Sequence, residues 1–120
     1  MLALRNASHT HHEVFEVEAL ASTDSVHMCI PQHIASQLRL DEYDKKEATL
    51  ADGSKPLVPY VGPLEIRFKD RVGFCGALVT GDQVVLGLIP LQTMDLVVPP
   101  KDRKIDVNPA NPNIASSIVM

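Results

Sequence analysis

Aromatic residues are scarce in this chain of 120 residues, which has no tryptophan, three phenylalanines and two tyrosines. Hydrophobic residues nevertheless make up 45% of the chain, which argues against global disorder. A core built from this composition must therefore be mainly aliphatic. The length suits one compact domain, residues 1–120, and little more.

Long runs of a single kind of residue are also missing. The net charge is -4 and no basic tract exists to neutralise phosphates, which argues against a nucleic-acid partner. No apolar run reaches the roughly 18 residues that would predict a membrane span, so we expect no membrane partner. The first residues become polar too quickly for a secretory signal, and we therefore expect a cytoplasmic protein.

Few residues in the chain are suited to binding metals. Cys29 and Cys75 are the two cysteines, and we expect them to be reduced, buried thiols, with a disulfide between them as the less favoured alternative. His9, His11 and His12 have imidazole nitrogens that can bind a transition metal. On a strand, however, His12 points away from the other two, so we expect no metal site and no cofactor.

Turn-forming residues recur about every 8–12 residues, a spacing typical of an all-β barrel or sandwich. We expect residues 31–40 to be helical for a turn or two, residues 41–47 to form a charged surface loop, and residues 90–94 to form a short helix. Residues 1–12 are expected to be an N-terminal arm, as a flexible lead-in or an edge strand, and residues 108–120 an irregular tail. The expected strands cover residues 13–21, 26–30, 61–68, 72–79, 84–89, 95–98 and 104–107.

A hairpin is the most specific local prediction. Asp52-Gly53 lies between two apolar runs within residues 48–58, and an Asp-Gly pair in that setting is the strongest short hairpin signal.

Three blocks of the chain resemble, in their order and spacing, the retropepsin-like aspartic peptidases. They are Leu20-Ala21-Ser22-Thr23-Asp24-Ser25, Leu50-Ala51-Asp52-Gly53-Ser54 and Val85-Leu86-Gly87-Leu88-Ile89-Pro90-Leu91. The segments at residues 94–100 and 107–109 resemble the ending common in the prokaryotic, single-domain branch of that family. The resemblance covers about residues 13–113.

The resemblance implies a closed barrel of the six-stranded type, with one short helix and a flap hairpin. It implies a homodimer in which residues 104–107 and part of residues 2–12 form interface strands, although a solvent-exposed tail is an equal alternative for these segments. The catalytic positions would be Ser22, Thr23 and Asp24. The substrate-binding positions would be Ala51, Asp52, Gly53 and Ser54 in the flap, together with Gly87.

The first block departs from the family at its catalytic residue. Aligned without gaps, Ser22 occupies the position of the catalytic aspartate, Thr23 is retained, and Asp24 replaces a glycine. Aspartic peptidases need two carboxylates that share one proton. A serine hydroxyl stays protonated near neutral pH and is a poor general base, and a homodimer would lose both carboxylates at once. We therefore expect a catalytically impaired homodimer that acts as a peptide-binding or interaction module.

Other hypotheses remain open. In extended chain Asp24 faces the same way as Ser22, so a shifted loop would make an active aspartic endopeptidase that uses Asp24 or a partner subunit's aspartate. Asp24 as a turn or capping residue is the structural alternative. A Ser22 nucleophile with His27 as its base lacks any marker of an oxyanion hole or an orienting group. A stable dimer without a ligand is the remaining class.

Overall fold

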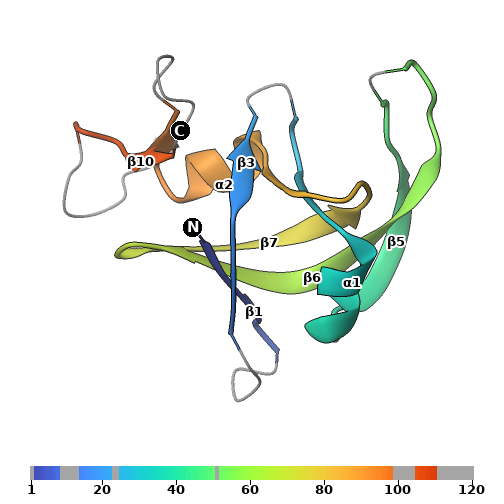
Figure 1. Ribbon diagram of the computed structural model, residues 1–120, viewed down its shortest axis with the longest axis horizontal. Helices are drawn as coiled ribbons and strands as arrows, with labels where there is room; N and C mark the ends of the chain where they lie inside the picture. The colour runs from blue at the N-terminus through green and yellow to red at the C-terminus, as the bar shows by residue number, and fades with distance from the viewer. Residues whose placement is uncertain (1, 9–13, 23–24, 51, 99–104, 111–120) are drawn as a thin grey trace, which may run out of the picture.

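The computed structural model describes residues 2–8, 14–22, 25–50, 52–98 and 105–110. The fold is mostly β, with a nearly closed, mixed, barrel-like sheet and two short helices (Figure 1). The elements are β1 (Leu2–Asn6), β2 (Phe15–Val17), β3 (Ala19–Ala21), β4 (Met28–Ile30), α1 (Gln32–Gln37), β5 (Asp41–Glu47), β6 (Leu57–Phe68), β7 (Arg71–Val79), β8 (Val84–Leu86), α2 (Leu88–Thr93), β9 (Leu96–Val97) and β10 (Asp106–Val107).

The main sheet is nearly closed because its two end strands are consecutive in the chain. The strand order is β2-β1-β6-β7-β4-β8-β3, and β5 pairs with β6 beside this path. Only Glu18 separates β2 from β3, so one continuous segment joins β1 at one end of the sheet to β8 at the other. The β3–β8 and β4–β7 pairs are parallel and the other pairs are antiparallel.

The core is mainly aliphatic, as the composition predicted. Phe68 is the one aromatic side chain among the buried hydrophobic residues in the described part of the chain. Along β1 and at Leu64, Ile66 and Phe68 of β6, every second side chain is buried, which is how the two strands supply the core. The largest fully buried side chains are mostly aliphatic: Leu2, Leu4, Met28, Ile30, Leu64, Ile66, Leu86 and Met94.

The outward face of β6 carries a buried carboxylate. Glu65 is only 5% exposed, although its alternation with Leu64 and Ile66 predicts the opposite face. Arg5 covers it, with 2.7 Å between Arg5 Nη2 and Glu65 Oε2, and Arg67 Nε donates to the same oxygen at 3.2 Å. These contacts, led by the hydrogen bond from Arg5, lower the pKa of Glu65 against the opposing effect of its burial.

Three expectations about the elements are corrected by the structure. Residues 41–47 are the edge strand β5 and not a loop, because a strand exposed to solvent can carry charged side chains along its length. Residues 2–6 form β1 inside the sheet, with β2 on one edge and β6 on the other, so they are not a free arm. The fold has two short helices, α1 and α2, where the family resemblance implied one.

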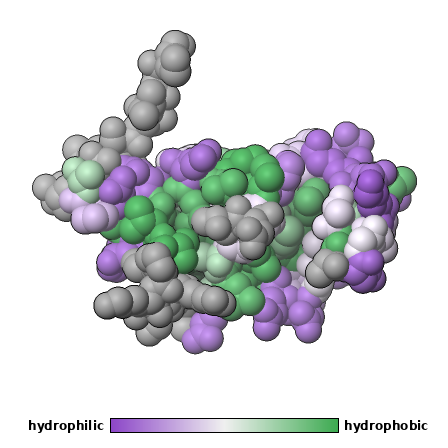
Figure 2. Space-filling model, turned by 90° about the horizontal axis from the view of Figure 1, so that it is seen from above, coloured by the Kyte–Doolittle hydropathy of each residue, from purple (hydrophilic) through white to green (hydrophobic). Residues whose placement is uncertain are grey.

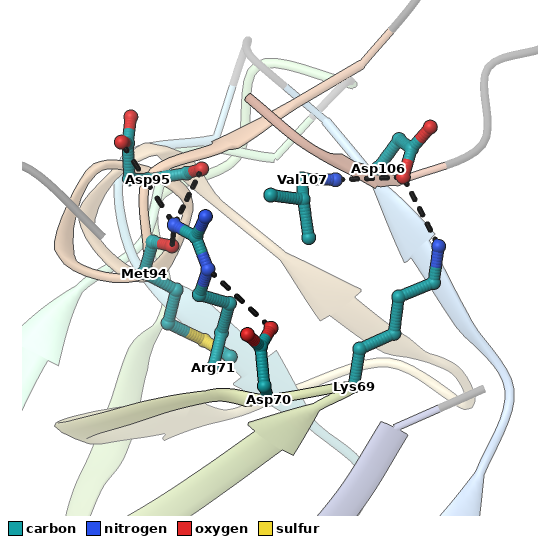
Figure 3. A network of polar contacts seen from close by, with 7 residues as sticks. All are labelled: Lys69, Asp70, Arg71, Met94, Asp95, Asp106 and Val107. Atoms are coloured by element: carbon teal, nitrogen blue, oxygen red, sulfur yellow. Dashed lines mark hydrogen bonds and ion pairs between the residues drawn. The ribbon is translucent and has the colours of Figure 1, made fainter. Parts of the chain in front are cut away.

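A buried arginine on β7 bonds to the backbone at the end of α2 (Figure 3). Arg71 is 2% exposed, and its Nη1 donates to the backbone oxygen of Met94 at 3.2 Å and to that of Asp95 at 3.5 Å. The carboxylates of Asp70 and Asp95 lie 3.6 and 3.8 Å from the guanidinium. Arg71 therefore satisfies carbonyls at the end of α2, where helical backbone lacks partners of its own.

An exposed ion pair joins the same two regions. Lys69 Nζ lies 3.1 Å from Asp106 Oδ1, so the β6–β7 turn contacts β10 (Figure 3). The predicted terminal strand is thus present as β10, and it pairs with β9 of the same chain.

Candidate functional site

The loop that contains Ser22 follows β3, which forms a parallel pair with β8. β3 runs alongside β8, and the ladder continues one step further, since the backbone N–H of Ser22 donates to Leu86 O at 3.0 Å. Ser22 is therefore fixed at the carboxyl end of β3. Thr23 and Asp24 lie outside the described residues, and the chain resumes at Ser25.

Gly87 makes the close contact that brings the first and third sequence blocks together. A Cβ on this residue would lie 2.3 Å from His27 O and 2.6 Å from Ser25 O. The next two backbone N–H groups, of Leu88 and Ile89, donate to Ser25 O at 2.7 Å and to Val26 O at 2.9 Å. Only glycine leaves room for this approach, so here the residue acts in packing the loop against the start of α2.

The second block forms the predicted hairpin tip between β5 and β6. Leu50 N donates to Ser54 O at 2.9 Å, and Gly53 has a φ of +85°, a backbone conformation that favours glycine. Asp52 Oδ1 accepts hydrogen bonds from Ser54 Oγ at 2.6 Å and Ser54 N at 2.9 Å, and these lower the pKa of Asp52. Ala51 lies outside the described residues.

A cleft of about 630 Å³ lies between the hairpin and the sheet. Its lining comes from three segments, within residues 25–29, 47–50 and 78–85. The structure thus brings the hairpin and the loop after Ser22 to one cavity. Of the predicted site residues, Ser22, Asp52, Gly53, Ser54 and Gly87 do not line it, although Ser25 and Leu50 beside them do.

Sequence reasoning missed the β7–β8 turn as part of this site. Residues 80–83 fall between two expected strands, at residues 72–79 and 84–89, and all four line the cleft. This contact is tertiary, so the sequence gives no signal for it. β4 lies between β7 and β8 in the sheet, and the turn that joins β7 to β8 therefore lies near the loop after Ser22.

Neither cysteine is set up as a nucleophile. Cys29 lines the cleft, 3.9 Å from the Ser25 hydroxyl, and its burial raises the pKa of the thiol more than the Ser25 hydrogen bond lowers it. Burial raises the pKa of Cys75 to about 11. Both thiols are free and partly buried, so they stay protonated near neutral pH.

Ser25, which lines the cleft, also uses its hydroxyl in a hydrogen bond. Ser25 Oγ donates to the backbone oxygen of His27 at 3.0 Å, and the His27 ring meets Tyr60 edge to face at 6.1 Å. The Ser25 hydroxyl therefore stabilises the loop by donating its proton to a backbone oxygen, and it does not donate that proton to a side chain that could act as a base.

Among the described residues, no group of three or more His, Cys, Asp or Glu side chains is arranged to hold a metal ion. His9, His11 and His12 lie outside the described residues. In the part of the chain that the structure describes, no helix has both the length and the apolar character to cross a membrane. Comparisons of the chain with protein-family models, curated proteins and solved structures found no match.

Proposed function

We propose that this protein is a retropepsin-like, catalytically impaired module that binds an extended peptide segment in the cleft beneath the hairpin. The observation that carries the proposal is the meeting of the three resembling blocks. Ser22 is bonded to Leu86, Gly87 packs on the loop that follows Ser22, and the hairpin forms the opposite wall of the cleft. Blocks that are far apart in the sequence thus converge on one cavity.

An extended peptide suits the shape and the chemistry of the cleft. Its volume of about 630 Å³ lies in the range typical of ligand pockets. Apolar side chains from the three walls, among them Val26, Leu50 and Val85, provide contacts for apolar residues of a peptide. In the described part of the chain β5 pairs only with β6, so its other edge has backbone groups available for an added strand.

Serine at position 22 is the reason to propose binding without aspartic peptidase catalysis. The reaction needs one ionised carboxylate to take a proton from water and one protonated carboxyl to polarise the peptide carbonyl. The Ser22 hydroxyl is neutral near pH 7 and supplies neither group. A symmetric dimer of this chain would lack both members of the acid pair at this position.

A homodimer is part of the proposal. Leu20 is 56% exposed, Val26 53% and Ile89 38%, and the three come from β3, the loop after it and the start of α2. Figure 2 shows hydrophobic surface across the middle of the face seen from above. Sedimentation should give a mass of about 26 kDa, twice the 13.1 kDa of the chain. A species of 13.1 kDa at high micromolar concentration would remove the dimer from the proposal.

Peptide binding is tested by amide chemical shifts of the labelled protein during titration with a library of blocked, apolar hexapeptides. Shifts should concentrate in residues 25–29, 47–50 and 78–85. The variant Leu50→Ala removes an apolar contact in the cleft and should weaken binding about tenfold. Leu57→Ala is the matched control, because Leu57 is 68% exposed on the same hairpin and does not line the cleft. Failure of every peptide to shift these residues would leave a dimer without a ligand.

A further inference from the structure

The cleft carries negative charge on two of its walls. Glu47 lies at the end of β5 and Asp82 in the β7–β8 turn, and both line the cavity. The described lining contains no lysine or arginine. The other polar groups of the described lining are hydroxyls, an amide, a thiol and the imidazole of His27.

The lysine nearest to Glu47 in the sequence contacts an aromatic ring. Lys46 precedes Glu47, and its Nζ lies 5.0 Å from the centre of the Tyr60 ring, in the geometry of a cation–π contact. Asp52 at the hairpin tip is likewise engaged, since both of its hydrogen bonds go to Ser54. Among the described residues, Glu47 and Asp82 are the acidic side chains that line the cleft.

We infer that the cleft selects peptide segments in which a lysine or arginine accompanies apolar residues, an inference that rests on the proposed peptide-binding function. Apolar residues of the peptide contact Val26, Leu50 and Val85 on the three walls of the cleft. The cationic side chain pairs with Glu47 or Asp82 of the lining. Both carboxylates are exposed, so each should strengthen binding by only about two- to fivefold.

The preference is measured with three blocked hexapeptides that share one apolar scaffold and differ at a single position, which is lysine, glutamine or glutamate. Isothermal titration at low salt should give the tightest binding for the lysine peptide and the weakest for the glutamate peptide. Moving the variable position along the scaffold locates the carboxylates relative to the peptide. Added salt should reduce the difference, because exposed charges are screened within about 10 Å at 0.1 M salt.

A double variant assigns the preference to the cleft. Glu47→Gln with Asp82→Asn should remove the advantage of the lysine peptide and leave binding of the glutamine peptide unchanged. The matched control is Asp41→Asn with Glu42→Gln, which makes the same change in net charge on exposed residues of β5 that do not line the cleft.

The outcomes separate this inference from the function on which it rests. Equal binding of all three peptides would overturn the charge preference and leave peptide binding intact. A preference that disappears equally in the control variant would overturn the assignment to the cleft. If none of the three peptides binds at any position of the scan, the proposed function and the preference fall together.

Discussion

Gly87 and Ser22 lie where the loop after β3 meets the start of α2. Gly87 matches the family that the chain resembles, and Ser22 departs from it. Gly87 is retained, and its missing side chain lets the carbonyls of Ser25 and His27 approach the start of α2. By the resemblance, Ser22 stands at the position of the catalytic aspartate, and its backbone N–H bonds to Leu86. The packing of the junction thus depends on backbone contacts that do not need the aspartate side chain.

Gly87→Ala should destabilise the protein by about 1–3 kcal/mol, because the new Cβ meets backbone atoms that must move. Urea unfolding followed by circular dichroism measures the change. Gly73→Ala is the control, since its Cβ would meet the flexible side chain of Met94 at 2.7 Å and the loss should be smaller. Equal stability of Gly87→Ala and the wild type would contradict the close approach.

Glu65 should make stability depend on pH. Its folded pKa is lowered from an ordinary value of 4.5, chiefly by Arg5, so its contribution is present above that value and is lost as the pH falls through the folded pKa. Glu65→Gln should cost about 1–3 kcal/mol at pH 7. The difference in unfolding free energy from the wild type should shrink below pH 4.5. A difference that stays constant down to pH 3 would count against the buried ion pair.

The hairpin turn could be predicted from Asp52 and Gly53, because it depends on local backbone properties. The chemistry assigned to Ser22 stays a prediction. The cleft lining could not be predicted. Asp82 and Gln83 reach the cavity only because β7 and β8 flank β4 in the sheet, and no neighbour in the sequence indicates that contact.

At the scale of elements, the hairpin and the C-terminal pair β9–β10 lie at opposite ends of the molecule (Figure 1). The hairpin is held by hydrogen bonds within its own turn, such as Leu50 N to Ser54 O. Arg71 contacts the two residues before β9, and Lys69 contacts β10 through an exposed ion pair. The two ends should therefore respond to different substitutions.

Gly53→Ala should loosen the hairpin locally, because a φ of +85° costs a residue with a side chain about 1 kcal/mol or more. Hydrogen exchange of the Ala48 and Leu50 amides, which donate to Pro56 O and Ser54 O, should become about tenfold faster. Gly81→Ala introduces the same kind of strain at φ +74° in another turn and should leave these two amides unchanged. Equal effects of the two variants would mean that the hairpin is not an independent unit.

Arg71→Met should destabilise the end of α2 and the strand β9 by about 3 kcal/mol, because buried carbonyls of Met94 and Asp95 lose their donor. Thermal unfolding measures the loss. Lys69→Met removes the exposed pair with Asp106 and a contact of Lys69 Nζ with the Phe68 ring at 5.4 Å, and its effect should be much smaller. Similar losses in the two variants would contradict the distinction between a buried and an exposed contact.

Local pattern predicted some elements well and misjudged others for a physical reason. The Asp-Gly turn and the alternation of Leu64, Ile66 and Phe68 identified the hairpin and the inward face of β6. β5 was taken for a loop because its seven residues have little apolar content, yet pairing with β6 satisfies its backbone without burying its side chains. The alternation places Glu65 on the face opposite Leu64 and Ile66, but it does not reveal that Arg5 covers the Glu65 carboxylate there.

At the scale of the whole molecule, the barrel is nearly closed by chain continuity through Glu18 and by contacts between distant segments. Ala19 lies opposite Val84 in the β3–β8 pair, and this pairing brings the loop after Ser22 to α2. Such a closure was predicted only through the family resemblance. Local periodicity allowed a sandwich equally well.

The central claim is that the cleft binds peptides but lacks the pair of carboxyl groups that would activate water to cleave them. The most direct test is to incubate the protein with the peptide library from pH 3 to 7. Mass spectrometry follows the peptides, and parallel titrations follow their binding. We predict bound peptides that remain intact at every pH, with the same result for Asp24→Asn. Repeated cleavage by the wild type that Asp24→Asn abolishes would contradict the account and would identify an aspartic endopeptidase.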